Sequence, residues 1–240
     1  MCGIAGIIHR GKSSNVGREM TTMLQALRHR GPDSTGFAVY GGSKPGDILM
    51  RIKVAEREDM DKGRGILKRI KERIAGVDEI LHEHGATIKE SESSTPYALR
   101  YVINHDGNTE EMAQHLEEIE GVEILSLGRG LELVKDLGDA TAVSDAYGLD
   151  SFEGTHAIGH ARMATESDVD IRSAHPYWAF PYNDVSVVHN GQITNYWTMR
   201  REMERSGHRF TSDCDSELLA VFTAHNLAHG ISLDESLRRS

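Results

Sequence analysis

The sequence is poor in cysteine, proline and aromatic residues. Its 240 residues include two cysteines and five prolines, and aromatic residues make up only 6% of the chain. Two cysteines, Cys2 and Cys214, exclude the disulfide framework that holds small secreted domains together. There is also no apolar run long enough to cross a membrane and no basic leader before one. We therefore expect no signal peptide and no membrane partner, and a cytoplasmic location.

Positive charge is scarce as well. Lysine and arginine number 27 against 37 acidic residues, which gives a formal net charge of −10. This balance disfavours a nucleic-acid partner, because binding to phosphates requires a basic surface. The length allows one large domain or two small ones, with enough chain to bury a core.

A cysteine stands directly after the initiator methionine. Aminopeptidases remove Met1 before a small residue, and removal would leave Cys2 with a free α-amine beside its thiol. A thiol of pKa about 8.5 and an α-amine of about 7.7–8.0 both titrate near neutrality, so the amine can act as the base for its own thiol. Residues 2–8 are expected to form a short buried strand that holds this nucleophile. The alternative is that Cys2 is an ordinary residue of a frayed terminus.

Apolar spacing predicts the order of elements along the chain. A helix over residues 15–30 is followed by a polar loop, and strands are expected at 37–40 and 48–54. The pattern of apolar residues changes near Ala55 from that of strands to that of an amphipathic helix. Residues 56–147 are expected to form a small inserted α/β segment. After Gly154 we expect strands at 155–163 and 185–189 and helices at 196–206, from 215 onward, and at 234–240.

Four polar features suggest chemistry when they are taken together. Alone, Arg162 is a surface arginine, Asn190-Gly191 a type I′ turn and Asp215 a helix cap. Jointly, a guanidinium matches an α-carboxylate and a carboxylate matches an α-ammonium group. An asparagine amide and a glycine N–H can form an oxyanion hole beside a thiol. With Cys2, these residues describe a site for the amide of an α-amino acid.

Five segments carry a family resemblance. They are Cys2–Gly6, Arg28–Asp33, Gly159–Thr165, His189–Gly191 and Asp215–Glu217. In this order they resemble the motifs of class II glutamine amidotransferases, which are N-terminal-nucleophile hydrolases. The likeness covers residues 2–54 and 151–230. It implies an α+β fold, a four-layer αββα sandwich of two antiparallel sheets, with residues 1–240 as one amidotransferase domain that contains the 56–147 insertion.

The resemblance also assigns roles to residues of this chain. Cys2 is the expected nucleophile, and Asn190 and Gly191 form the expected oxyanion hole. The α-carboxylate of the substrate, L-glutamine, is expected at Arg162 and Thr165, and its α-ammonium at Asp215. The loop that includes Arg28 and Gly31 is similar to the one that shapes the glutamine pocket in this family. No metal and no cofactor are expected.

Residues 154–167 and the size of the insertion resemble one branch of the family. That branch contains the separate glutaminase subunits of glutamate synthase and N-methylglutamate synthase type enzymes. The likeness implies a separate synthase subunit that receives ammonia, in a homo- or hetero-oligomer. Met163 and Glu166 depart from the family, which often has tryptophan and histidine at these positions. The chain also stops soon after the Asp215 helix, where compact relatives continue, so we expect either a C-terminal truncation or a sandwich that lacks those strands and is incomplete.

Two other functions fit the same motifs. One is a non-catalytic regulatory or assembly subunit that keeps the glutaminase fold. The other is an N-terminal cysteine amidase for a different amide. The pairing of Arg162 with Asp215 disfavours the second alternative, because the two residues together select a zwitterionic substrate.

Overall fold

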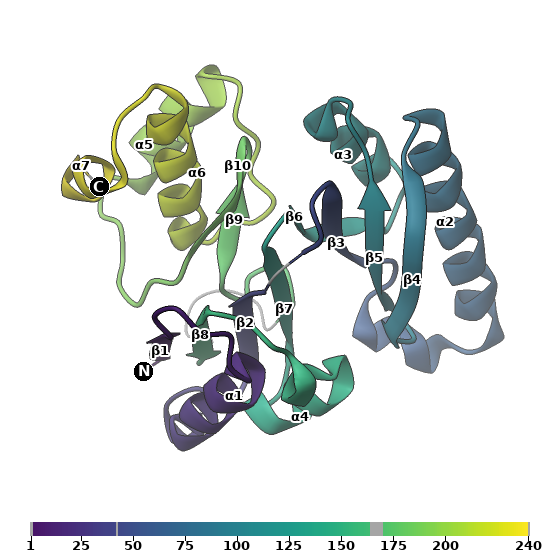
Figure 1. The fold of residues 1–240 in the computed structure, drawn as a ribbon, viewed down its shortest axis with the longest axis horizontal. Helices are drawn as coiled ribbons and strands as arrows, with labels where there is room; N and C mark the ends of the chain where they lie inside the picture. The colour runs from purple at the N-terminus through teal and green to yellow at the C-terminus, as the bar shows by residue number, and fades with distance from the viewer. Residues whose placement is uncertain (1, 42, 164–169, 240) are drawn as a thin grey trace. The chain divides into compact units, whose positions relative to one another are not determined.

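The computed structural model describes residues 2–41, 43–163 and 170–239, apart from the side chains of residues 62 and 64. The chain divides into two compact units (Figure 1). One unit runs from Gly42 to Glu132, and the other combines the residues before and after that stretch. Among the described residues, no helix is both long enough and apolar enough to span a membrane.

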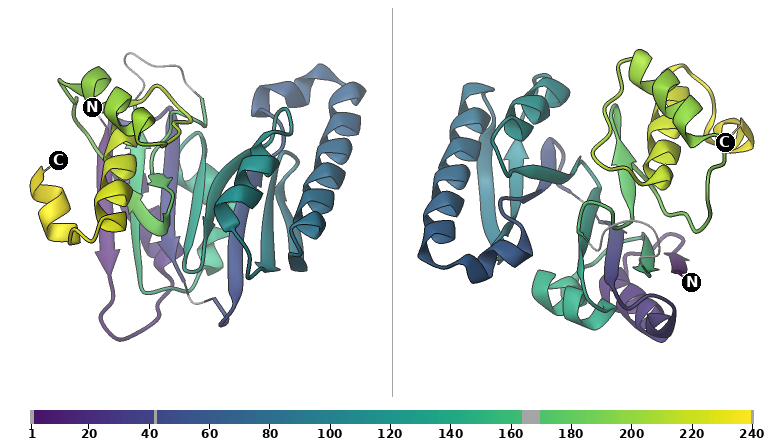
Figure 2. Two further views of the ribbon diagram at one scale, coloured as in Figure 1. Left: turned by 90° about the horizontal axis from the view of Figure 1, so that it is seen from above. Right: turned by 180° about the vertical axis from the view of Figure 1, so that it is seen from behind.

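A four-stranded sheet is the base of the first unit, in the order β1-β8-β2-β7. Its strands are β1 (Gly3–Ile8), β2 (Ser34–Tyr40), β7 (Leu131–Leu137) and β8 (His156–Arg162). β8 pairs antiparallel with β1 on one side and with β2 on the other. The helices α1 (Val16–Ala26) and α4 (Ala140–Tyr147) pack against each other beside this sheet (Figures 1 and 2).

A second, two-stranded sheet belongs to the same unit. It consists of β9 (Tyr177–Ala179) and β10 (Tyr182–Val187), which pair antiparallel. The helix α6 (Asp215–Ala228) packs on both strands and contacts α5 (Tyr196–Arg205) and α7 (Leu233–Arg239). The first unit therefore contains two sheets with helices against each.

The two sheets of the first unit come close enough to touch. The Tyr40 hydroxyl of β2 lies 2.6 Å from the Ser186 hydroxyl of β10. At Gly36 a Cβ atom would lie 1.8 Å from the carbonyl oxygen of His175, so β2 needs glycine where the segment before β9 crosses it. The predicted α+β sandwich of antiparallel sheets and helices is confirmed.

The second unit is a four-stranded antiparallel sheet in the order β4-β5-β3-β6 with two helices. Its elements are β3 (Asp47–Lys53), α2 (Arg64–Glu83), β4 (Thr87–Thr95), β5 (Ala98–Asn104), α3 (Thr109–Glu117) and β6 (Glu123–Gly128). Short 3-10 turns lie at Arg28–Arg30, Arg57–Lys62 and Leu149–Ser151.

The boundaries of this unit differ from the 56–147 segment expected from the sequence. β3 belongs to the unit because it pairs with both β5 and β6. α4 falls in the first unit because it packs on α1. The change in sequence pattern near Ala55 follows the end of β3. It therefore marks the end of a strand within the compact unit and not the start of that unit.

Candidate active site

Cys2 lies at the entrance to β1, beside the end of β8. Gly3 is paired with Ala161, which brings Cys2 to the last residues of β8. Its Sγ atom is 3.4 Å from the backbone nitrogen of Met163, which donates to it, and 3.6 Å from the Met163 carbonyl oxygen. A Cβ atom at Gly3 would lie 2.9 Å from Cβ of Leu27, so the start of β1 packs directly against the residue that ends α1. Cys2 is therefore held at an ordered position.

The Asn190 side chain reaches Cys2 from the segment that follows β10. Its Nδ2 atom donates a hydrogen bond of 3.1 Å to the carbonyl oxygen of Cys2. Neither Asn190 nor Gly191 has a positive φ angle, which a type I′ turn requires at both of its central residues. The simple hairpin interpretation of Asn190-Gly191 is therefore wrong, because the chain leaves β10 here and runs toward α5.

Asp215 is the first residue of α6 and lies next to the same segment. Its Oδ2 atom accepts a hydrogen bond of 2.6 Å from the backbone nitrogen of Ile193. The N-terminal end of a 14-residue helix carries partial positive charge, which stabilises an ionised carboxylate there. Cys2, Asn190 and Asp215 are thus connected through residues 190–193.

Arg162 ends β8 and is only 5% exposed. Its backbone is fixed on the β2 side, where Asp33 donates a hydrogen bond of 3.1 Å to its carbonyl oxygen. Its charge also acts on two buried histidines. Burial lowers the pKa of His160 to about 4, and the Arg162 guanidinium adds to this effect. Burial, together with nearby cations that include Arg162, holds the pKa of His175 well below its usual range.

The backbone of the loop from Arg28 to Gly31 packs against the end of β8. A Cβ atom at Gly31 would lie 2.3 Å from the carbonyl oxygen of Ala161, so only glycine allows the loop to lie against β8. Arg28 lines a cavity of about 770 Å³ beside α1, together with Arg18 and Gln25. The role of Arg28 in the glutamine pocket, which the resemblance implies, stays a prediction. Thr165 lies outside the described residues.

A larger cavity of about 1160 Å³ opens beside the segment that holds Asn190. Its lining includes Gly191, Ile193, Tyr196, Arg200, Phe210 and Asp215. Gly191 and Asp215, two of the predicted site residues, therefore face a common space. Polar and aromatic groups converge on it, as in many small-molecule sites.

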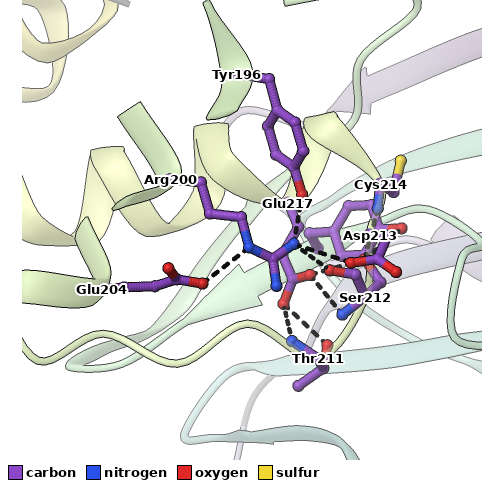
Figure 3. Close-up of polar contacts among 9 residues, drawn as sticks. Tyr196, Arg200, Glu204, Thr211, Ser212, Asp213, Cys214 and Glu217 are labelled. Carbon is purple, nitrogen blue, oxygen red and sulfur yellow. Dashed lines mark hydrogen bonds and ion pairs between the residues drawn. The ribbon is translucent and has the colours of Figure 1, made fainter. Parts of the chain in front are cut away.

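The sequence analysis assigned no role to Arg200 and Glu217, which organise one wall of this cavity (Figure 3). Arg200 donates to the Ser212 carbonyl oxygen at 2.9 Å and lies over the Phe210 ring, 4.6 Å from its centroid. The Glu217 carboxylate is buried and accepts four hydrogen bonds from the backbone and hydroxyl groups of Thr211 and Ser212, at 2.7–2.9 Å. Glu217 belongs to the recognised Asp215–Glu217 motif, so its position was a signal, although only Asp215 was assigned a role.

Comparison with known proteins identifies the family of the chain. A model of the glutamine amidotransferase domain matches residues 160–237. Over 243 aligned residues the chain is 40% identical to "Putative glutamine amidotransferase" of Methanothermobacter thermautotrophicus, an alignment that covers 100% of this chain and 77% of that protein. The chain belongs to the class II glutamine amidotransferases. It is accordingly an enzyme of the glutamine amidotransferase type.

Other relatives match this sequence over nearly all or part of its length. The glutamine amidotransferase-like protein GlxB of Rhizobium meliloti is 29% identical over 239 residues, which cover 99% of this chain and 74% of that protein. A glutamine–fructose-6-phosphate aminotransferase of Pyrobaculum aerophilum is 32% identical over 112 residues, which cover 47% of this chain and 18% of that protein. The likeness to GlxB thus runs through the Gly42–Glu132 unit.

Proposed function

We propose that the chain hydrolyses L-glutamine to glutamate and ammonia, with Cys2 as the nucleophile. The observation that carries this proposal is the position of Cys2. Its sulfur lies at the end of the strand that ends in Arg162, and its carbonyl oxygen accepts a hydrogen bond from Asn190. A nucleophile and an amide donor are thus in contact, at the end of the strand that carries Arg162.

The substrate would be held by its charged groups. In the proposed complex, Arg162 and Thr165 bind the α-carboxylate of glutamine and Asp215 binds the α-ammonium, while the Arg28–Gly31 loop shapes the pocket. Arg162 is buried, so its pairing with a carboxylate is weakly screened by solvent. This arrangement favours glutamine over amides that lack either charge.

The proposed reaction has two steps. With Met1 removed, the α-amine of Cys2 takes the thiol proton, and the thiolate attacks the δ-carboxamide carbon to form a C–S bond. The oxyanion accepts hydrogen bonds from Asn190 and from the Gly191 N–H. The C–N bond then breaks, and ammonia leaves with the proton held by the amine. Water hydrolyses the γ-glutamyl thioester, which releases glutamate and restores the thiol.

The contact between Asn190 and Cys2 is compatible with this role. A side-chain amide carries two donor hydrogens, and the Cys2 carbonyl oxygen uses one of them. The other remains for the oxyanion, while the first fixes the orientation of the amide before substrate binds. Preorganised donors of this kind typically contribute about 10²–10³ in rate each.

Ammonia would be passed on to a synthase rather than released. We propose that the acceptor is a separate subunit of the glutamate or N-methylglutamate synthase type. The resemblance of residues 154–167 to the glutaminase subunits of those enzymes supports this proposal.

Replacement of the thiol tests the proposed reaction. Cys2→Ala should lower the rate of glutamine hydrolysis by more than about 10³-fold, because the covalent route is lost. Ammonia and glutamate release are measured with glutamine and, as a control, with asparagine, which is one methylene shorter. Unfolding in urea should show that Cys2→Ala keeps the stability of the parent chain. Retained glutamine turnover in this variant would overturn the proposal.

A further inference from the structure

Ser216 connects two motifs that are 25 residues apart in the sequence. It is the second residue of α6 and only 3% of it is exposed. Its Oγ atom lies 2.9 Å from Nδ1 of His189, and it donates to Oδ1 of Asp215 at 3.3 Å. The residue before Asn190 and the first residue of α6 are therefore joined through one buried hydroxyl.

The direction of these hydrogen bonds follows from the number of protons. A serine hydroxyl has one hydrogen, and an ionised carboxylate can only accept. If Ser216 donates to Asp215, it must accept from His189, so His189 carries its proton on Nδ1. The Nε2 atom of the same ring lies beside Gly191, where a Cβ atom would approach it to 2.6 Å. The ring thus packs against the glycine of the proposed oxyanion hole.

Both oxygens of the Asp215 carboxylate are held within the protein. Oδ2 accepts from the Ile193 backbone nitrogen at 2.6 Å, and Oδ1 accepts from Ser216. These two bonds, from different segments, fix the plane of the carboxylate. Each oxygen has about two acceptor sites, so the carboxylate retains capacity to accept from a bound ammonium group.

We infer that Ser216 is a positioning residue, which orients Asp215 toward the α-ammonium group of the substrate. The inference rests on the proposed function, in which Asp215 binds that group. Within the Asp215–Glu217 motif, the serine hydroxyl would then restrict the orientation of the aspartate carboxylate. Ser216 therefore contributes to the selection of α-amino amides over amides that lack the amine.

The test compares two ligands in one preparation of each variant. L-glutamine has the α-ammonium group, and 4-carbamoylbutanoate has the same carboxylate and carboxamide without it. Ser216→Ala should raise the KM for glutamine about tenfold with a smaller change in kcat, because a charge-assisted hydrogen bond is lost. The inhibition constant of 4-carbamoylbutanoate against glutamine hydrolysis should change less than about twofold. Partial unfolding would reduce the active fraction without separating the two ligands.

Two further variants complete the design. Ser216→Thr keeps the hydroxyl and should restore a KM for glutamine close to that of the parent. Ser236→Ala removes another buried serine hydroxyl, which accepts from Asn226 at 3.0 Å within the packing of α6 and α7, and should change neither constant. An equal loss of affinity for both ligands in Ser216→Ala would mean a merely structural role and would overturn the inference.

Asp215→Asn separates this inference from the proposed function. If Asp215→Asn weakens glutamine selectively and Ser216→Ala does not, the positioning role fails while the proposed function stands. If Asp215→Asn weakens both ligands equally, the proposed role of Asp215 fails, and the inference about Ser216 falls with it.

Discussion

His160 and His175 lie face to face between the two sheets of the first unit. Their ring centroids are 4.2 Å apart, and at most 6% of either residue is exposed. Burial lowers the pKa of both rings, to about 4 for His160. Both imidazoles are therefore neutral near pH 7. They add no positive charge to the buried surroundings of Arg162.

This state of His160 makes stability depend on pH. The unfolded chain binds a proton below about pH 6.5, whereas the folded chain binds it only near pH 4, so stability falls as the pH drops between these values. Between pH 7 and about pH 5 the parent chain should lose about 2 kcal/mol through this residue. His160→Phe should lack that loss when the free energy of unfolding is measured in urea at both pH values. The cost of the substitution itself cancels in the comparison, and an identical pH dependence in both proteins would contradict the assignment.

At the scale of elements, the start of α6 depends on an acidic residue in its first turn. Cys214 is the N-cap residue but makes no side-chain capping hydrogen bond. Glu217 in the first turn instead reaches back to the segment before the helix, where it accepts from Thr211 and Ser212, and the Ser212 hydroxyl in turn accepts from the Cys214 backbone nitrogen at 3.2 Å (Figure 3). Glu217 thus fixes the residues that lead into α6.

Glu217→Gln should destabilise the chain by about 3 kcal/mol. A glutamine has one carbonyl oxygen, so donors that the second carboxylate oxygen satisfied would face an NH₂ group. The matched control is Glu204→Gln. Glu204 is more exposed and accepts from Arg200 at 2.9 Å, so this substitution should lower the free energy of unfolding by less than about 1 kcal/mol. Urea unfolding of both variants checks the difference, and equal costs would argue against the role of Glu217 at this junction.

The elements with clear apolar spacing could be predicted, whereas several others, among them α4, could not. α1, α5 and α6 appear where the helical stripes indicated, and β1, β3 and β8 lie close to the expected strands. β4 was missed because its sequence, Thr-Ile-Lys-Glu-Ser-Glu-Ser-Ser-Thr, is polar and mostly exposed, so it has no alternating pattern. β7 was missed because charged residues such as Glu132 and Lys135 interrupt it, although tertiary contacts bury them. β9 has only three residues.

The candidate site could be predicted in its chemistry but not in its supports. The motifs indicated Cys2, Asn190 and Asp215, and the structure links these residues through residues 190–193. They did not indicate Ile193, because its contribution is a backbone N–H that any residue can supply. Nor did they indicate that Arg28 lines a cavity beside α1.

At the scale of the whole molecule, the described site residues all belong to one compact unit. Cys2, Arg162, Asn190, Gly191 and Asp215 lie in the first unit, although the 91-residue stretch from Gly42 to Glu132 interrupts it in the sequence. Pairing of β1 and β2 with β8 brings the two halves of that unit together. A long interruption in the sequence therefore does not separate these residues into different units, and the compact second unit has its own sheet.

The central claim is that the thiol of Cys2 attacks the amide of glutamine. Its most direct test is incubation of the full chain with a glutamine-mimicking diazoketone, followed by peptide mass spectrometry. Because the sequence has only two cysteines, Cys214 is an internal control for simple thiol reactivity. We predict one adduct per chain, on Cys2 of a peptide that begins at Cys2, and its loss when excess L-glutamine is present. An adduct on Cys214, or no adduct on a chain that hydrolyses glutamine, would contradict the account.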